Sequence, residues 1–215
     1  YGLVGSEMCI RDSSHPMYIM LKPAGSLCNL RCKYCYYLEK SKLYDDNKNH
    51  VITDALLEKF IKEYIEAQTT PQVLFTWHGG ETLMRPISFY RRALELQRYY
   101  ARGRQIDNSI QTNGILLNDE WCRFFKENNF LVGVSIDGPQ EFHDEYRRNA
   151  MGKPSFHQVM KGIDLLNKHG VEWNALAVVN DFNADYPLDF YHFFKEIGCR
   201  YIQFTPIVEL SLIHI

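Results

Sequence analysis

Apolar residues along the chain follow two alternating spacings. Short continuous apolar runs are typical of buried strands, and an apolar residue every three or four positions is typical of an amphipathic helix. The strands predicted in this way cover residues 17–23, 73–77, 109–112, 131–136, 173–179 and 201–208. Helices are expected between them, and strand–helix alternation with short links predicts parallel strands joined by right-handed crossovers. The pattern therefore indicates one α/β domain.

Capping residues mark where the predicted helices begin and end. Thr53 is expected to cap the first long helix, and Pro86 to open the next one. The run from Ser155 to Gln158 has the spacing of a capping box, and Gly170 is a stop signal for the helix that follows the box. The remaining helices are expected around residues 121–128 and over residues 188–197.

Composition and charge narrow the class of protein. The 215 residues, 46% of them hydrophobic, suffice for one α/β domain with its own core. A formal net charge of −2 argues against a nucleic-acid partner. The chain has no apolar run of membrane-spanning length and no secretory signal at its start, so we expect no membrane partner and a cytoplasmic protein.

The two ends of the chain fit no element of this pattern. Residues 1–14 and 210–215 resemble translated adaptor sequence, and the alternative is a disordered native tail. We therefore place the core domain at residues 15–209.

Three cysteines within eight residues, Cys28, Cys32 and Cys35, follow the first predicted strand. A soft three-thiolate site without a fourth protein ligand suits an iron–sulfur cluster, whose last iron can bind a reacting molecule. A structural zinc site needs four protein ligands.

The other cysteines are not expected to complete this site. Cys122 lies in an amphipathic helical stretch and is predicted to be a small buried apolar residue. Cys199 precedes a strand, so it lies at the opposite edge of a parallel sheet from the three cysteines. Cys9 lies in the excluded tail. A zinc site would therefore need His50 as its fourth ligand.

Polar and glycine residues gather at the carboxyl ends of the predicted strands, the edge where parallel α/β sheets build their sites. They are Gly79, Gly80, Glu81, Gln111, Ser135, Asp137, Asn180 and Thr205. Turn formation explains a single Gly or Asn, but it does not easily explain Gln111 and Ser135 inside apolar strands.

This edge suits the chemistry of S-adenosylmethionine (SAM). A free iron of a reduced [4Fe–4S] cluster can hold SAM and pass an electron into its sulfonium, which yields methionine and a 5′-deoxyadenosyl radical. Gly79 and Gly80 would let the backbone approach the methionine part of SAM. Glu81 can accept a hydrogen bond from its ammonium or ribose, and Arg147 can bind its carboxylate as a planar fork.

Longer motifs carry a family resemblance. They are KPAGSLCNLRCKYCYYLEK, WHGGETL, SIQTNG, FLVGVSIDGP and IQFTPIVE. On these motifs, over residues 17–209, the chain resembles the anaerobic sulfatase-maturating enzymes of the radical SAM superfamily. The resemblance implies an α/β fold, a partial (β/α)6 TIM-like barrel truncated after strand six. Members of that family continue into a C-terminal domain with two further [4Fe–4S] clusters and an aspartate proposed as the general base. We expect this domain to be absent here, so no catalytic residue is expected in this chain.

The resemblance also assigns residues and partners. Cys28, Cys32 and Cys35 would hold the [4Fe–4S] cluster, and Tyr34 would contact the adenine side of SAM. The residues expected to bind or border SAM are Gly79, Gly80, Glu81, Gln111, Ser135, Arg147 and Val208. The substrate would be a sulfatase polypeptide, whose Cys or Ser is oxidised to Cα-formylglycine. A donor such as flavodoxin or ferredoxin would supply the electron.

Plainer interpretations stand beside these. Arg147 can form a surface ion pair with Glu145 or Asp144, and Val208 can be core packing. The polar residues interpreted as structural are His78, Asp137 and His143. Two rival functions also remain: another peptide-modifying radical SAM maturase, such as a thioether-forming enzyme, and a non-enzymatic zinc-binding module.

Overall fold

Six parallel strands form one sheet in the computed structural model, which describes residues 17–40 and 51–207 of the chain. The strands are β1 (Met20–Leu21), β2 (Gln72–Trp77), β3 (Gln105–Thr112), β4 (Leu131–Ser135), β5 (Trp173–Val179) and β6 (Ile202–Pro206). They pair in chain order, and every pairing is parallel. The predicted six-stranded α/β fold is confirmed.

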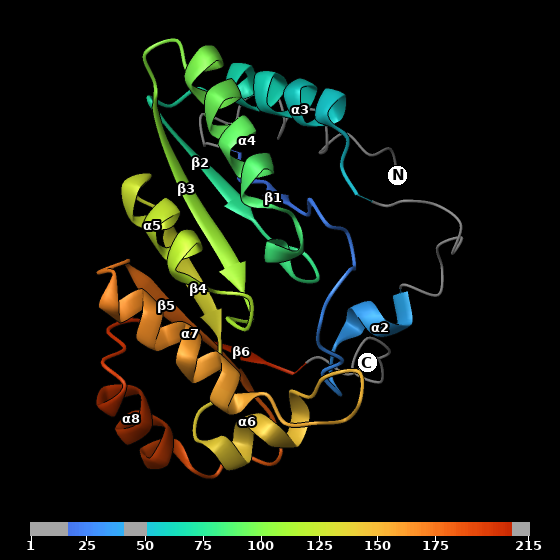
Figure 1. The fold of residues 1–215 in the computed structure, drawn as a ribbon, viewed down its shortest axis with the longest axis vertical. Helices are drawn as coiled ribbons and strands as arrows, with labels where there is room; N and C mark the ends of the chain where they lie inside the picture. Colours follow the sequence, from blue (N-terminus) through green and yellow to red (C-terminus); the bar gives the residue numbers. More distant parts are fainter. Residues whose placement is uncertain (1–16, 41–50, 208–215) are drawn as a thin grey trace, which may run out of the picture.

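The order of the strands determines where the helices lie. Because consecutive strands are neighbours, each right-handed crossover passes over the same face of the sheet. The helical segments are α2 (Tyr36–Lys40), α3 (Asp54–Ala67), η2 (Thr82–Met84), α4 (Ile87–Tyr100), α5 (Asp119–Glu127), α6 (Gln140–Tyr146), α7 (Phe156–Lys168) and α8 (Pro187–Glu196). Figure 1 shows α3, α4, α5, α7 and α8 along the outside of a curved sheet, which forms a half-barrel.

The two edge strands differ from the sequence prediction. The buried strand predicted at residues 17–23 is reduced to the two residues of β1, where Met20 is 61% exposed. On the other edge, β6 is also largely exposed, including Phe204. Each of these strands pairs with only one neighbour within the described residues. An apolar run in an edge strand can therefore stay exposed, which is why the runs did not predict burial correctly here. Both edges border the open side of the half-barrel.

Strand β3 begins before the strand predicted at residues 109–112. The prediction relied on apolar residues, and the first half of β3 is polar. Asn108 lies in that half and is buried on the side of the helices. Its side-chain carbonyl accepts hydrogen bonds from Trp77 Nε1 (2.8 Å) and Gln97 Nε2 (2.9 Å), and its amide donates to Gln97 Oε1 (2.9 Å). A polar side chain with all these partners costs little to bury, so polarity does not end the strand.

The capping box predicted at the start of α7 is wrong. Ser155 is the N-cap residue, but its hydroxyl makes no capping hydrogen bond. Instead it donates to the carbonyl of Arg147 at 2.8 Å. Asp144 satisfies the helix start, because its Oδ1 accepts from the amides of Ser155 and Phe156, both at 2.9 Å. The predicted caps at Thr53 and Pro86 are confirmed in position.

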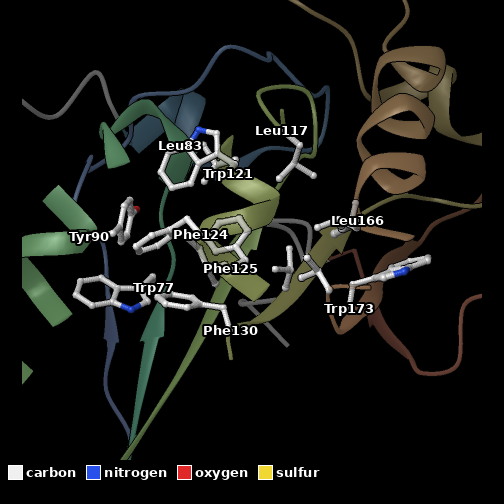
Figure 2. Packing of buried hydrophobic residues seen from close by; sticks show 14 of the residues in the cluster. Trp77, Leu83, Tyr90, Leu117, Trp121, Phe124, Phe125, Phe130, Leu166 and Trp173 are labelled. Atoms are coloured by element: carbon white, nitrogen blue, oxygen red, sulfur yellow. The ribbon is translucent and has the colours of Figure 1, made fainter. Parts of the chain in front are cut away.

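An aromatic layer joins α4 and α5 to the outer face of the sheet (Figure 2). Trp77 of β2 packs edge-on against Tyr90 of α4, with ring centroids 5.5 Å apart. Tyr90 packs in the same way against Trp121 of α5 at 5.6 Å, and Trp121 stacks on Phe125 at 5.3 Å. Cys122, on the same helix, is fully buried, as predicted. This layer holds the middle of the sheet rigid beneath its carboxyl-end edge.

Within residues 17–40 and 51–207, no helix is both apolar and long enough to cross a bilayer.

Candidate functional site

The cysteine loop (residues 22–35) follows β1 and leads into α2. Cys28 is exposed, Cys35 is half-buried and Cys32 is buried, and all three thiols are free. The amide of Cys35 donates to the carbonyl of Cys32 at 3.0 Å, which closes the turn before α2. Cys199 lies just before β6, at the other end of the parallel sheet, as predicted.

One side of the cysteine loop is held by the turn after β2. The amide of Gly80 donates to the carbonyl of Gly25 (2.9 Å), and the amide of Glu81 donates to that of Leu27 (2.7 Å). A Cβ placed on Gly80 would lie 2.3 Å from the Leu27 carbonyl oxygen. Gly79 has a φ of +132°, which favours glycine. The sequence explained these glycines by the approach of SAM, whereas the structure explains them by the approach of the cysteine loop. Their contact with SAM stays a prediction.

The other side of the cysteine loop is held by the post-α6 segment (residues 146–149). The amide of Arg31 donates to the carbonyl of Arg148 (2.7 Å), and the amide of Lys33 donates to the carbonyl of Tyr146 (2.9 Å). An antiparallel bridge joins residues 30 and 149, and the side chain of Lys33 pairs with Glu145. The loop is therefore clamped between two segments that lie far away in the sequence.

Glu81 links the turn after β2 to the end of β3 rather than facing open space. Its Oε1 accepts from the amide of Leu83 (2.9 Å) and the hydroxyl of Thr112 (2.8 Å), and its Oε2 accepts from the amide of Asn113 (2.7 Å). Burial raises the pKa of this carboxyl, and these hydrogen bonds oppose the rise. Because the carboxylate has these partners and is almost unexposed, the geometry gives it a structural role. The prediction that Glu81 binds or borders SAM stays a prediction.

Gln111 and Ser135 are brought together, as their places in the sequence suggested. They lie near the ends of the neighbouring strands β3 and β4, and Gln111 Nε2 donates to the Ser135 hydroxyl at 3.3 Å. Side chains alternate between the two faces of a strand, and Asn108 and Ile110 of β3 face the helices. Gln111 therefore points to the inner face of the half-barrel, which is polar near its carboxyl-end edge.

Arg147 forms a buried ion pair, which the sequence did not predict. Its Nε donates to Oδ2 of Asp137 (2.8 Å) and its Nη2 to Oδ1 (3.0 Å). The hydroxyl of Tyr34 donates to the same Oδ2 at 2.5 Å. The pair with Asp137 corrects the alternative of a surface ion pair with Glu145 or Asp144. Two of the Arg147 nitrogens are used within the protein, and contact of Arg147 with the SAM carboxylate stays a prediction.

Charge and hydrogen bonding keep the Asp137 carboxyl ionised. Burial opposes its ionisation, but the charge of Arg147 and the hydrogen bonds from Arg147 and Tyr34 hold its pKa below the ordinary value. The neighbouring His143 is fully buried, and burial lowers its pKa to about 4. Its Nδ1 accepts from the amide of Asp137 at 3.4 Å. His143 is thus a neutral structural residue, as the sequence interpretation held.

Asn113 is a site residue that the sequence analysis missed. Its side-chain amide donates to Oδ1 of Asn29 (2.7 Å) and lies 3.8 Å from the sulfur of Cys28. The amide of Leu30 donates to the same sulfur at 3.3 Å. In the sequence Asn113 stands only within the motif SIQTNG, and its position directly after a predicted strand is the signal that could have placed it beside the cysteine loop.

The donor set fits an iron–sulfur cluster. Three free thiols occupy one loop, and N–H donors of Leu30 and Asn113 lie beside the Cys28 sulfur, as is common around cluster ligands. Although Cys28 as a whole residue is exposed, desolvation of its sulfur raises the pKa of the thiol to about 11. Coordination to a metal deprotonates such a thiol. Among the described residues, no three His, Cys, Asp or Glu side chains converge as ligands of a single metal ion.

Several predicted residues lie outside the described part of the chain. They are Val208 of the predicted SAM pocket, Cys9, the zinc alternative His50, and residues 1–14 and 210–215 of the predicted tails.

Curated proteins similar to this chain are named as sulfatase-maturating enzymes. The serine-type anaerobic sulfatase-maturating enzyme of Bacteroides thetaiotaomicron is 74% identical over 199 residues, which cover 93% of this chain and 48% of that protein. The cysteine-type enzyme of Clostridium novyi is 39% identical over 192 residues, which cover 89% of this chain and 51% of that protein. The chain thus spans about half the length of the curated relatives that it matches.

Solved structures agree with the observed topology. A structure described as native anSMEcpe with bound AdoMet and Cp18Cys peptide has a TM-score of 0.81 at 34% identity, and the match covers 89% of this chain and 51% of that chain. Streptococcus suis SuiB bound to S-adenosylmethionine has a TM-score of 0.65 at 15% identity, over 89% of this chain and 41% of that chain, which shows a shared fold alone.

The model of the radical SAM superfamily matches residues 23–194. That span contains the three cysteines, both clamping segments and the ion pair of Arg147 with Asp137. The sequence match covers most of the chain and agrees with the half-barrel and its cysteine loop, so this chain belongs to the radical SAM superfamily.

Proposed function

We propose that this chain is the radical SAM core of an anaerobic sulfatase-maturating enzyme, which oxidises a side chain of a sulfatase to Cα-formylglycine. The observation that carries the proposal is the cysteine loop, whose three free thiols are clamped across the carboxyl-end edge of the half-barrel. The named sulfatase-maturating relatives support the substrate.

A [4Fe–4S] cluster and SAM would supply the chemistry, which is reductive cleavage of SAM to a 5′-deoxyadenosyl radical. Cys28, Cys32 and Cys35 hold the cluster. Leu30 and Asn113 direct N–H groups to the Cys28 sulfur, which stabilises negative charge on that ligand.

The chain's own residues would orient SAM. The inner face near Gln111 and Ser135 offers hydrogen-bonding groups for the polar parts of SAM. Arg147 brings a positive charge to the same edge, in an orientation set by Asp137. We also propose that the backbone of Gly79 and Gly80 borders the methionine part of SAM, as the family resemblance implies.

The substrate type follows from one relative. The protein that is 74% identical is named serine-type, whereas more distant relatives of the two types differ little in their identity to this chain, for example 41% for a serine-type and 39% for a cysteine-type enzyme. We therefore propose that the target residue in the sulfatase is a serine. The electron is proposed to come from a flavodoxin or ferredoxin, and the site of action is proposed to be the cytoplasm.

Anaerobic reconstitution tests the cofactor part of the proposal. The chain is expected to bind about four irons and four sulfides, to absorb broadly in the visible range, and to form 5′-deoxyadenosine from SAM under dithionite. The Cys35→Ala variant should lose all three properties. Stoichiometric zinc without 5′-deoxyadenosine would overturn the proposal in favour of the zinc-binding module.

Matched peptides test the substrate. Two sulfatase-derived peptides that differ only in having Ser or Cys at the target position are incubated with the full-length protein, SAM and dithionite. We expect formylglycine from the serine peptide, detected by mass spectrometry as an aldehyde. Conversion of the cysteine peptide alone would contradict the serine assignment, and thioether formation in either peptide would favour the rival maturase.

A further inference from the structure

Four buried residues beyond the end of β4 form a closed ring of hydrogen bonds. The amide of Asp137 donates to Nδ1 of His143, whose Nε2 lies 3.0 Å from the Ser155 hydroxyl. That hydroxyl donates to the Arg147 carbonyl, and the Arg147 side chain returns to the Asp137 carboxylate. All four residues are at most 7% exposed. A ring of this kind fixes the direction of every group in it.

The Asp137 carboxylate joins three segments of the chain at one point. Its Oδ2 accepts from Tyr34 of the cysteine loop and from Nε of Arg147. Its Oδ1 accepts from Nη2 of Arg147 and from the amide of Val178 in β5, the latter at 2.9 Å. Tyr34 lies between Cys32 and Cys35 in the sequence, so this carboxylate locates the end of the cysteine loop relative to β4 and β5.

The ring also controls the other contacts of the cysteine loop. The two carbonyls that accept from the loop belong to Tyr146 and Arg148, the residues on either side of Arg147. Whatever holds Arg147 in place therefore also holds the acceptors for the amides of Arg31 and Lys33. Asp137 touches the loop directly through Tyr34 and indirectly through these carbonyls.

We propose that Asp137 is a positioning residue for the cofactors: it holds Tyr34 and Arg147 at once and so fixes the Cys32–Cys35 part of the loop at the end of β4. The inference rests on the proposed function, because it concerns the same cluster and SAM. Asparagine cannot replace this carboxylate, since its amide would direct N–H groups toward the donors of Arg147 or Tyr34.

Hydrogen exchange of the chain without cofactors gives the first test. In Asp137→Asn, the amides of Arg31 and Lys33 are expected to exchange at least about tenfold faster, because their acceptors move. Amides in β2 and β3 should keep their rates. Asp119→Asn is the control, because the Asp119 carboxylate also accepts from side chains, those of Lys168 and His169, but these partners lie at the end of α7 and not in the cysteine loop or the segments that clamp it. Unchanged exchange at Arg31 and Lys33 in folded Asp137→Asn would overturn the inference.

The reconstituted chain gives the second test, read by electron paramagnetic resonance of the reduced cluster. Asp137→Asn is expected to bind iron and sulfide but to need about tenfold more SAM for the spectral change that SAM causes in the unaltered chain. Its midpoint potential is expected to rise, because the charge of Arg147 loses its counterion near the cluster. If the unaltered chain shows no cluster, the proposed function fails. If the unaltered chain does show a cluster, and Asp137→Asn has the same SAM dependence and midpoint potential as the unaltered chain and Asp119→Asn, the inference alone fails.

A second variant covers the case in which Asp137→Asn does not fold. Ser155→Ala removes the link to the Arg147 carbonyl but leaves the ion pair in place. In Ser155→Ala, exchange at the amides of Arg31 and Lys33 is expected to be faster, and more SAM should be needed for the spectral change. Both effects should be smaller than in Asp137→Asn. Ser155→Ala with the exchange rates and SAM dependence of the unaltered chain would then overturn the inference.

Discussion

The outer face of the half-barrel and its carboxyl-end edge are stabilised by different interactions. On the outer face, rings from α4 and α5 pack on β2, as in the contact of Tyr90 with Trp77. At the edge, hydrogen bonds join residues far apart in the sequence, such as Tyr34 and Asp137. Apolar packing is not directional, whereas each hydrogen bond needs both partners in place. The outer face should therefore determine whether the chain folds, and the edge whether the folded chain holds its cofactors correctly.

Truncation of an aromatic ring on the outer face should have the largest effect on stability. Phe125 is fully buried in the aromatic layer. Phe125→Ala is expected to lower the free energy of unfolding by about 3–5 kcal/mol, measured by urea denaturation. Phe125→Leu, a milder change, covers the case in which the alanine variant does not fold. Iron uptake per folded molecule should stay unchanged in both. Reduced uptake by the folded fraction would show that the two regions are not separable.

The buried His143 at the edge should make stability depend on pH. Its pKa is lowered by burial from 6.5 to about 4, so the unfolded chain binds a proton before the folded chain does. Stability is therefore complete above pH 6.5 and is lost as the pH falls toward 4. The loss should reach about 3 kcal/mol. His143→Gln should flatten this part of the profile, and the exposed His157→Gln should not. An equal slope in both variants would remove His143 as the cause.

Adding a methyl group at Gly80 should affect the edge more than the fold. A Cβ there would lie 2.3 Å from the Leu27 carbonyl, so Gly80→Ala has to push the cysteine loop away. We expect a loss of about 1–3 kcal/mol in stability and a large loss of iron in anaerobic reconstitution. Gly103→Ala is the control, because its Cβ would meet no atom within 4 Å. Gly103, unlike Gly80, has a positive φ (+82°), so this control carries backbone strain without a steric clash. Normal iron content in Gly80→Ala would refute the clamp.

The smallest effect is expected from the side chain of Lys33. Its ion pair with Glu145 is largely exposed, and exposed pairs contribute little. The backbone amide of Lys33, which donates to Tyr146, is kept in any substitution. Lys33→Gln should therefore leave iron content and urea midpoint within experimental error. A clear drop in iron content would mean that the side chain, and not the backbone, holds this side of the loop.

The outer face was predictable from the sequence because its signal is local. Apolar periodicity located the helices, and Cys122 was correctly predicted as buried. Exposure at the edges was not predictable, since Met20 and Phe204 lie in apolar runs whose sheet neighbours the sequence does not show.

The edge was less predictable because its partners are distant in the sequence. The cysteine spacing was recognised, and Gln111 and Ser135 were placed at the carboxyl ends of their strands, but the hydrogen bond between them was not predicted. The capping box failed because the Ser155 hydroxyl binds a carbonyl of residue 147, which no local pattern encodes. The plainer alternative for Arg147 was an ion pair with the near neighbours Glu145 or Asp144, whereas the protein pairs it with Asp137, ten residues earlier.

The double clamp on the cysteine loop also bears on the order of assembly during synthesis. Residues 28–35 leave the ribosome early, but one half of their support arrives with residues 146–149. A nascent chain shorter than this presents three thiols without the geometry that retains a cluster. The proposed cluster would therefore meet its complete clamp only after residues 146–149, more than a hundred positions beyond Cys35, have been made and folded.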